Sequence, residues 1–259
     1  MDIVVCVKTN PDPQMVRIRN REPVLEAVPY KLGDLDKNAL EAAIQVRDAV
    51  GGKVVAVTVA ETNRKIKETV KEALAMGADE AVIVDDPAAM TLDQAAVATV
   101  IAAAVKKLPA CDLLLFGEGS SDNYTGQVPS RVAEKLGVPQ VGYARKVEAA
   151  EGAVRCERSM DEMIETLELP LPAAVTVVSE INEPRIPSLM HIMKAGSKPT
   201  QVWTLADIGV DAAALAPKQE VVSNLAEEQD RKHVLFEGAA AEQAAAFVDA
   251  LVKEGVVGR

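Results

Sequence analysis

The stretch CDLLLFGEGSSDNYTGQVPSRVAEKLG, Cys111–Gly137, contains a strand pattern, a loop and a helix pattern in that order. An apolar run typical of a buried strand is followed by a loop rich in glycine and serine, and then by an amphipathic run that predicts a helix. Pro129 suits the first turn of that helix, because the N–H group it lacks would be unpaired there anyway. This order predicts an α/β fold in which the loop faces a ligand.

Upstream of this unit, short apolar strands alternate with helical patterns. The strands are predicted at Ile3–Lys8, Lys53–Ala60, Glu80–Asp85 and Asp112–Phe116. Each is almost continuously apolar, as strands covered on both faces are. The helices are indicated by Ala39, Ala43, Val46 and Val50, by Ile66, Val70, Ala73 and Leu74 between Thr62 as N-cap and Gly77 as C-cap, and by the run Thr91–Lys107. Right-handed crossovers then predict a doubly wound, mostly parallel, Rossmann-like sheet that binds an adenine nucleotide.

The pattern changes after Gly137, where strands become shorter. They are predicted at Gln140–Ala149, Ala153–Ser159, Glu165–Leu169 and Ala173–Ile181. This spacing favours an antiparallel or mixed extension of the same sheet. Beyond it we expect a Pro-rich segment, an arm of short pieces from Thr204 to Gly238 and a last helix at Ala239–Lys253. The predicted domains are 1–203, including a segment at 182–198, and 204–259.

The composition bounds the partners and the location. Lys and Arg total 28 against 39 Asp and Glu, which leaves a net charge of -11 and argues against a nucleic-acid partner. No stretch reaches the roughly 18 apolar residues that a membrane span needs. The start MDIVVCVKTNPD lacks the basic and long apolar parts of a signal peptide. We therefore expect a cytoplasmic protein without a membrane span.

Residues that could carry catalysis or bind a metal are poorly placed in this sequence. His191 and His233 have no ligand-type partner at helical spacing, and no serine lies in a GxSxG motif. The acidic residues of the late strands alternate with apolar ones, as on a solvated strand face; they are Glu157, Asp161, Glu162, Glu165 and Glu168. Cys6, Cys111 and Cys156 are expected to be small buried side chains in strands. The sequence predicts a binding scaffold with no catalytic residue and no metal site.

The loop GEGSSDNYTGQV fits a phosphate or a pyrophosphate. Gly117, Gly119 and Gly126 permit close backbone approach, while serine and threonine hydroxyls can donate to oxygen. The alternative is a solvated turn in which Asp122 or Thr125 caps the helix. Both interpretations stay open, because GxGxxD is not the GxGxxG motif and no Walker A lysine is present.

Longer blocks of sequence carry a family resemblance. These blocks are IVVCVKTNPD, DLDKNALEAAIQVRD, ALAMGADEAVIV, GEGSSDNYTGQV, ERSMDEMIETLELPLPAAVTV, NEPRIPSLMHIMKAGSKP and QVWTLADIGV. They span nearly the full chain, which resembles the β subunit of electron transfer flavoproteins. The resemblance is greatest to the Fix-type branch associated with nitrogen fixation and carnitine metabolism.

The resemblance implies a heterodimer whose α subunit carries the electron-transferring FAD, while the β subunit holds its own nucleotide. That nucleotide is AMP in conventional members and a second FAD in bifurcating members. Thr125 and Gln127-Val128 match the bifurcating pattern, which favours FAD with AMP as the alternative. The cofactor contacts implied are Cys6, Val7, Lys8, Asp36, Asn38, Val59, Ala60, Glu61, Gly117, Asp122, Asn123, Tyr124, Thr125, Gly126, Gln127 and Val128.

The resemblance also implies protein partners. Leu189, with Ile186 and Met190, would contact a flavoprotein dehydrogenase or a quinone oxidoreductase, and ferredoxin or flavodoxin would be a low-potential acceptor. Residues 204–259 would wrap the α subunit. NADH oxidation, and so an enzymatic role, is expected only of a bifurcating protein. The alternatives are a conventional AMP-binding subunit that accepts electrons from acyl-CoA dehydrogenases, a non-redox nucleotide-binding regulatory module and an adenylating enzyme.

For the 182–198 segment itself, an alternative interpretation buries Ile192 and Met193 beneath the segment while Leu189 projects from it.

Overall fold

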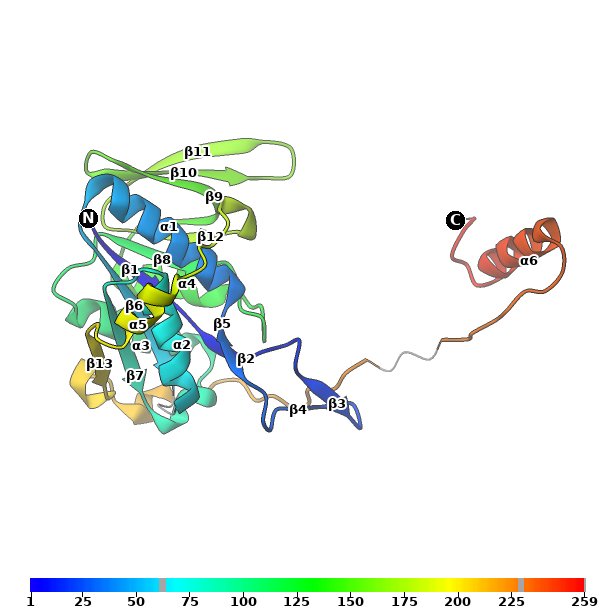
Figure 1. Ribbon diagram of the computed structural model, residues 1–259, viewed down its shortest axis with the longest axis horizontal. Helices are drawn as coiled ribbons and strands as arrows, with labels where there is room; N and C mark the ends of the chain where they lie inside the picture. Colours follow the sequence, from blue (N-terminus) through cyan, green and yellow to red (C-terminus); the bar gives the residue numbers. More distant parts are fainter. Residues whose placement is uncertain (61–63, 228–230, 259) are drawn as a thin grey trace.

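A computed structural model describes residues 1–60, 64–227 and 231–258. Within these residues the main sheet has nine strands in the order β11-β10-β9-β12-β8-β1-β6-β7-β13 (Figure 1). The parallel strands are β1 (Asp2–Cys6), β6 (Lys53–Ala60), β7 (Glu80–Asp85), β8 (Leu113–Gly117), β12 (Ala173–Val177) and β13 (Thr200–Trp203). β9 (Gln140–Ala150) runs parallel to β12, and antiparallel pairs join β9 to β10 (Ala153–Ser159) and β10 to β11 (Ile164–Pro170). The predicted mostly parallel sheet with a mixed extension is confirmed.

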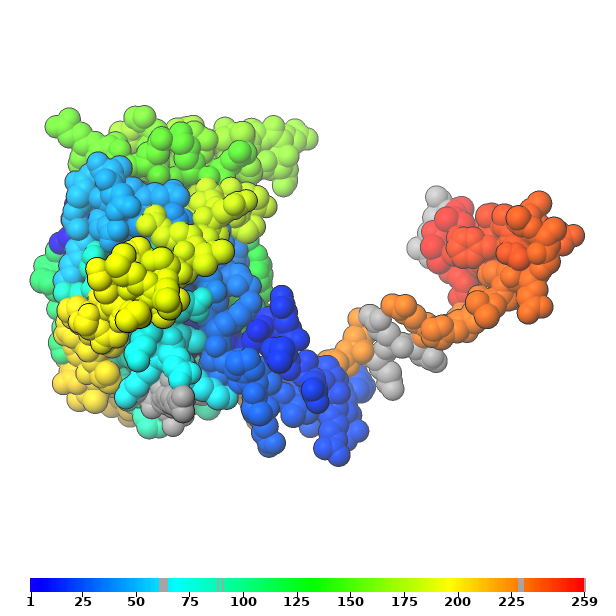
Figure 2. All heavy atoms as spheres, viewed as in Figure 1, coloured from blue at the N-terminus to red at the C-terminus, as the bar shows by residue number. Residues whose placement is uncertain are grey.

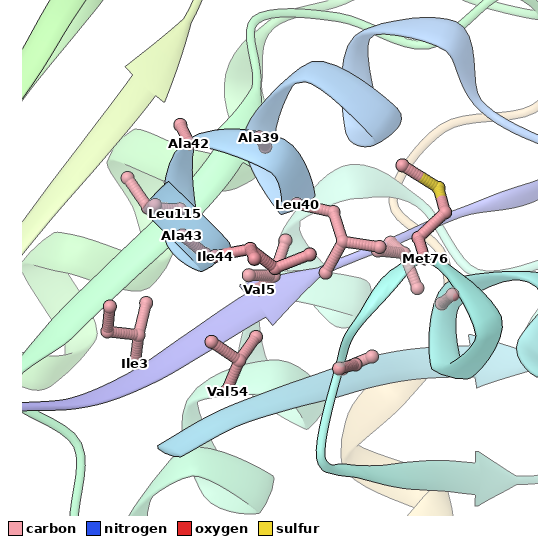
Figure 3. Close-up of a cluster of buried hydrophobic side chains, with 14 of the residues drawn as sticks. Ile3, Val5, Ala39, Leu40, Ala42, Ala43, Ile44, Val54, Met76 and Leu115 are labelled. Atoms are coloured by element: carbon pink, nitrogen blue, oxygen red, sulfur yellow. The ribbon is translucent and has the colours of Figure 1, made fainter. Parts of the chain in front are cut away.

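Helices cover both faces of the sheet. α1 (Asp34–Val50) and α2 (Arg64–Met76) pack on one face, whereas α3 (Gln94–Lys107) and α4 (Gln127–Leu136) pack on the other. Successive side chains of β1 point to opposite faces of the sheet. Ile3 and Val5 therefore pack in the core beneath α1 and α2, and Val4 packs in the core beneath α3 and α4. Figure 3 shows the first layer, in which Leu40 and Ile44 of α1 lie over Val5 and Val54.

Short elements connect and extend the sheet. They are the hairpin strands β2 (Thr9–Pro11) with β5 (Tyr30–Leu32) and β3 (Arg17–Arg19) with β4 (Glu22–Val24), the helix α5 (Leu189–Ala195), and the 3₁₀ turns η1 (Pro87–Met90), η2 (Ser179–Ile181), η3 (Ala206–Ile208) and η4 (Ala212–Leu215). β13 adds to the free edge of β7 in parallel register. None of the hairpin strands, β13 or α5 is predicted from the sequence, because three- to seven-residue elements carry too little periodicity.

Predicted boundaries agree best where the apolar runs are sharp. β6, β7 and β10 begin and end at their predicted residues. β1 ends at Cys6 rather than Lys8, because the Lys8 N–H bonds the Asp36 carboxylate and leaves the sheet. The strand predicted to reach Ile181 ends at Val177, where η2 follows and Asn38 binds the Ser179 carbonyl.

The helix ends agree with the predictions in part. α3 begins at Gln94 rather than near Thr91, because Asp93 is the N-cap and accepts from the Ala96 N–H at 2.8 Å. α2 ends just before Gly77, as predicted, with a glycine φ of +142°. Thr62, the predicted N-cap of α2, lies outside the described residues.

The cysteines, histidines and acidic strand residues discussed above differ in their exposure to solvent. Cys6 and Cys156 are buried and Cys111 is half-buried. Cys111, however, comes just before β8 rather than in a strand. His191 and His233 are exposed. The acidic strand face is partly solvated and paired with arginine, as in Arg155–Glu168 at 2.9 Å and Arg158–Glu165 at 2.7 Å.

The carboxyl-terminal region separates from the body. Leu205 and Leu215 are buried against the α3 layer, so residues 204–215 still pack on the sheet. After η4 the described residues form no strand or helix until α6 (Ala240–Lys253), which stands away from the body (Figures 1 and 2). None of the residues of α6 is buried. In the described part of the chain, no helix combines the length and apolarity needed to cross a bilayer.

Candidate nucleotide site

A cleft of about 250 Å³ opens at the carboxyl ends of β1, β6 and β8. β1 lies between β8 and β6, and the chain passes from β1 to β6 by α1 on one face and from β7 to β8 by α3 on the other. The order of strands therefore reverses beside β1. In open α/β sheets such a reversal leaves a crevice where ligands bind.

Most predicted cofactor contacts line this cleft. Those that do are Cys6, Val7, Lys8, Asp36, Val59, Ala60, Gly117, Asp122, Asn123, Thr125, Gly126, Gln127 and Val128. They come from loops far apart in the sequence, and the parallel strands bring the loops to one edge of the sheet. Whether these residues contact a cofactor stays a prediction.

Two predicted residues lie outside the cleft lining, and a third is not described. Asn38 lies outside the cleft lining, and its side-chain amide donates to the Asn182 carbonyl at 2.8 Å. Tyr124 is also outside the lining, 60% exposed, and its hydroxyl bonds a Glu118 carboxylate oxygen. Glu61 lies outside the described residues. The predictions did not foresee that Asn38 would turn away from the cleft.

The cleft lining also holds residues outside the set of cofactor contacts that the resemblance implies, although Gly119 and Ser120 among them belong to the predicted phosphate loop. They are Thr9, Asn10, Pro11, Val57, Ile66, Ala89, Leu92, Gln94, Val97, Ile101, Phe116, Glu118, Gly119, Ser120 and Pro129. Val57 could have been found from the two-residue period of a strand, since Val59 was predicted. The residues of α3 carried no such signal, because that helix approaches the cleft only through the sheet topology.

The loop after β8 presents backbone amides to the cleft. Gly126 occupies the N-cap of α4 with a φ of +61°, and no side chain caps this helix. The alternative in which Asp122 or Thr125 caps α4 is therefore wrong. The first N–H groups of α4 remain available to an anion, and the helix dipole also favours an anion at this end.

A close approach of α1 shapes the other side of the loop. A Cβ atom at Gly117 would lie 2.7 Å from Leu35 Cβ and 2.9 Å from Asp36 Oδ1. Any larger residue at this position would push the loop and α1 apart. Glycine is thus required where β8 passes beneath the start of α1.

Charge in the cleft is concentrated at its mouth. Lys8 is the only Lys or Arg among the described lining residues, and its ammonium pairs with Asp122 at 2.5 Å. Burial works to raise the pKa of Asp122, but hydrogen bonds from Lys8 and Ser120 hold that pKa below its ordinary value. A phosphate could bind beside this pair and share the Lys8 ammonium with Asp122, because both side chains are partly exposed.

Asp36 is the buried acid of the cleft wall. Burial raises its pKa to about 7, against the lowering effect of the Lys8 and Gly117 backbone N–H groups. The Lys8 N–H donates to Asp36 Oδ2 at 2.8 Å. This carboxyl therefore ties the ends of β1 and β8 to α1, and the raised pKa makes it less often ionised near neutral pH than an ordinary aspartate, which reduces repulsion of a phosphate.

The inner part of the cleft is apolar. Val57 of β6, Phe116 of β8, and Val97 and Ile101 of α3 form its walls. Burial raises the pKa of the Cys6 thiol well above its usual value, so this side chain acts as an apolar neighbour. A flat base fits such walls, and the amides of α4 lie where a phosphate would follow.

A second feature lies on the α2 side of the sheet. Residues 182–198, called the docking segment after the role predicted for them, contain α5, which packs against α2. The segment's apolar side chains are exposed, with Ile186 at 93% and Leu189 at 74%. Met190 is likewise exposed. Ile192 and Met193 are 55% and 76% exposed, so the alternative that buries them beneath the segment is wrong.

A match to a known family covers the docking segment and all of the cleft lining except Cys6–Pro11. A family model described as electron transfer flavoprotein domain matches residues 24–208. This range begins in β4, ends at η3 and includes the loop after β8 and the docking segment. The match covers more than half of the chain.

Proposed function

Because the chain belongs to the electron transfer flavoprotein family, we propose that it is the β subunit of a Fix-type heterodimer that carries electrons between partner proteins. The family implies an electron-transfer role and a partner subunit. The β identity and the Fix-type branch rest on the sequence blocks given above. The α subunit would hold the electron-transferring FAD.

The observation that carries the proposal is the cleft at the strand reversal. It combines an uncapped helix start, one cation and apolar walls, which are the parts an adenine nucleotide needs. The backbone of Asp122–Val128 and the Thr125 hydroxyl would hold the phosphates. Lys8 would neutralise part of their charge, and Val57 and Phe116 would face the base.

FAD is the nucleotide that we propose for this site, with AMP as the alternative. FAD would supply hydride acceptance from NADH and one-electron transfer toward ferredoxin or flavodoxin and a quinone-linked oxidoreductase. The chain's own residues would bind the nucleotide, keep its base from water and fix its orientation. Thr125 and Gln127-Val128 support FAD, since they match bifurcating relatives and line the cleft.

The docking segment would recognise the electron-transfer partner. Leu189 projects from a short helix, with Ile186 and Met190 beside it. An apolar anchor of this size stabilises a complex by roughly 2 to 3 kcal/mol and leaves quickly, because no charge pair must be resolvated. A regulatory nucleotide-binding module would explain the cleft but not this exposed segment. A conventional subunit that serves acyl-CoA dehydrogenases would use both features with AMP.

Nucleotide analysis of the purified heterodimer tests the proposal. Acid release should yield about two FAD and no AMP per heterodimer, one flavin for each subunit. Gln127→Ala and Asp122→Ala should lower the β-site content several-fold, through lost loop hydrogen bonds of about 1 to 3 kcal/mol. Glu134→Ala, an exposed position further along α4, should leave it unchanged. One FAD and one AMP would assign the conventional class, and a heterodimer without nucleotide in this subunit would reject the site.

A further inference from the structure

Helix α1 carries three buried polar side chains near its start. Asp36, Asn38 and Glu41 are 7%, 6% and 4% exposed. Burying such groups is costly unless each finds a hydrogen-bond partner. Their partners therefore show which parts of the molecule this helix connects.

Asp36 connects α1 to the cleft. Its carboxylate accepts from the Lys8 N–H, and the backbone of Gly117 passes close beside it. Lys8 and Gly117 both line the cleft. A nucleotide held by these two strand ends would thus rest against the first turn of α1.

Asn38 connects the same helix to the start of the docking segment. Its amide donates to the Ser179 carbonyl at 3.2 Å and the Asn182 carbonyl at 2.8 Å. The Asn182 amide donates back to the Asn38 carbonyl at 3.0 Å. The two asparagines hold each other through backbone atoms on both sides.

Glu41 adds a charged contact one turn further along. Arg185 donates to it from Nε at 2.6 Å and Nη2 at 3.0 Å, and the Arg185 N–H adds a bond at 3.3 Å. Burial works to raise the pKa of Glu41, but the bonds from Arg185 and Gln45 lower that pKa below its ordinary value. This bidentate pair fixes the chain immediately before Ile186 and α5.

We propose that α1 couples the nucleotide cleft to the docking segment, with Asn38 and Glu41 as positioning residues. This inference rests on the proposed function, which supplies the nucleotide and the docking role. Asp36 and Glu41 are separated by about 7.5 Å along a stiff helix, at about 1.5 Å per residue. A nucleotide that steadies the start of α1 also steadies Asn182 and Arg185, and so the base on which Leu189 stands.

Hydrogen exchange of the full-length chain, purified with its partner subunit and stripped of β-site nucleotide, tests the coupling. AMP and FAD are the probes, and peptides covering 117–128 and 186–198 are followed by mass spectrometry. In the wild type, either probe should slow exchange in both peptides, by about fivefold or more in 186–198. Asn38→Ala and Glu41→Gln should keep the effect in 117–128 and lose it in 186–198.

Two further variants serve as a second test and as a control. Asn182→Ala breaks the contact from the segment's side and leaves α1 intact, so it should also lose the remote protection. Lys37→Gln removes the Lys37–Glu72 ion pair of the same helix, which does not involve the docking segment, and should behave like the wild type. Protection of 117–128 without any change in 186–198 of the wild type would overturn the coupling and leave the nucleotide site standing. Failure of both probes to protect 117–128 would overturn the proposed function instead.

Discussion

The docking segment and the last part of the chain, residues 216–258, both expose large apolar side chains. This last part is called the arm below. The two segments differ in how they are attached to the body. Leu189 is 74% exposed in the first, and Val222 and Leu235 are 91% and 89% exposed in the second. The docking segment is fixed at its start by Glu41 and Asn38, and at its end by Lys198, whose ammonium donates to the Leu74 and Ala78 carbonyls.

Among its described residues, the arm forms hydrogen bonds with the body near its beginning. The Lys218 N–H donates to the Asp93 carboxylate at 2.9 Å. The Ala226 N–H donates to the Arg21 carbonyl, and the Arg21 side-chain Nε donates to the Ala226 carbonyl. Among the described residues from 231 onward, the hydrogen bonds and ring contacts are internal, such as Phe236 against Phe247. Figure 2 shows this end of the chain standing apart from the body.

Under the proposed function, this difference would give two modes of recognition. A segment fixed in advance loses little conformational entropy on binding, which suits a brief contact with an electron-transfer partner. An arm with few contacts to the body among its described residues must be ordered by association, which suits a lasting contact with a subunit. Both segments expose large apolar side chains, so their contacts with the body decide between the modes.

The largest expected effect comes from removing the arm. A chain that ends at Leu215 keeps the buried residues of the body. It should lose affinity for the partner subunit by at least about a thousandfold, since two apolar contacts of 2 kcal/mol each already account for that factor. Size-exclusion chromatography with light scattering measures the loss. Leu189→Ala, the control from the docking segment, should elute as a heterodimer, and co-elution of the truncated chain would remove the arm from the subunit interface.

The next effect compares one ion pair from each region. Arg185→Ala leaves Glu41 buried without its partner and should lower the free energy of unfolding by about 2 to 3 kcal/mol, toward the low end for buried pairs because Arg185 is 38% exposed. Lys232→Ala breaks the exposed Lys232–Glu254 pair of the arm and should change it by less than about 0.5 kcal/mol. Urea unfolding distinguishes them. Equal effects would mean that the docking segment is no better anchored than the arm.

A pH titration should separate the regions more finely. The folded pKa of Glu41 is lowered, so its contribution to stability is present above the unfolded value of about 4.3 and is lost as pH falls through the folded pKa. In Glu41→Gln, the free energy of unfolding should therefore fall less steeply as the pH is lowered than in the wild type. The difference between the two proteins should be smaller than the stability lost in Arg185→Ala. Unfolding free energies of both proteins between neutral and acid pH provide the measurement. Parallel curves would show that Glu41 does not contribute.

The smallest effect on stability is expected from the exposed leucines themselves. Leu189→Ala and Leu235→Ala should each change the free energy of unfolding by less than about 0.5 kcal/mol, because neither side chain is buried. Their functional effects should differ. Leu189→Ala should slow electron transfer to the quinone-linked partner and raise its Michaelis constant, with flavin content unchanged, whereas Leu235→Ala should weaken the heterodimer. A large loss of stability in Leu189→Ala would contradict the docking interpretation.

The sequence by itself determined the sheet and the approximate place of the cleft. β6, β7 and β10 have their predicted bounds because a strand's apolar pattern is written in consecutive residues. Parallel strands with right-handed crossovers then place the loop after β8 beside the end of β1. Most predicted cleft residues follow from that rule, since only strand order and loop position are required.

Only the tertiary structure decided what the buried polar residues of α1 contact. Asn38 meets Asn182 and Glu41 meets Arg185 across 144 positions of sequence, and Lys8 meets Asp122 across 114. No local periodicity encodes such pairs, because each depends on how the layers pack and on which face of α1 is covered. The same reason kept α5 and β13 out of the predictions: both are too short to be stable alone, and they form where α2 and the open edge of β7 receive them.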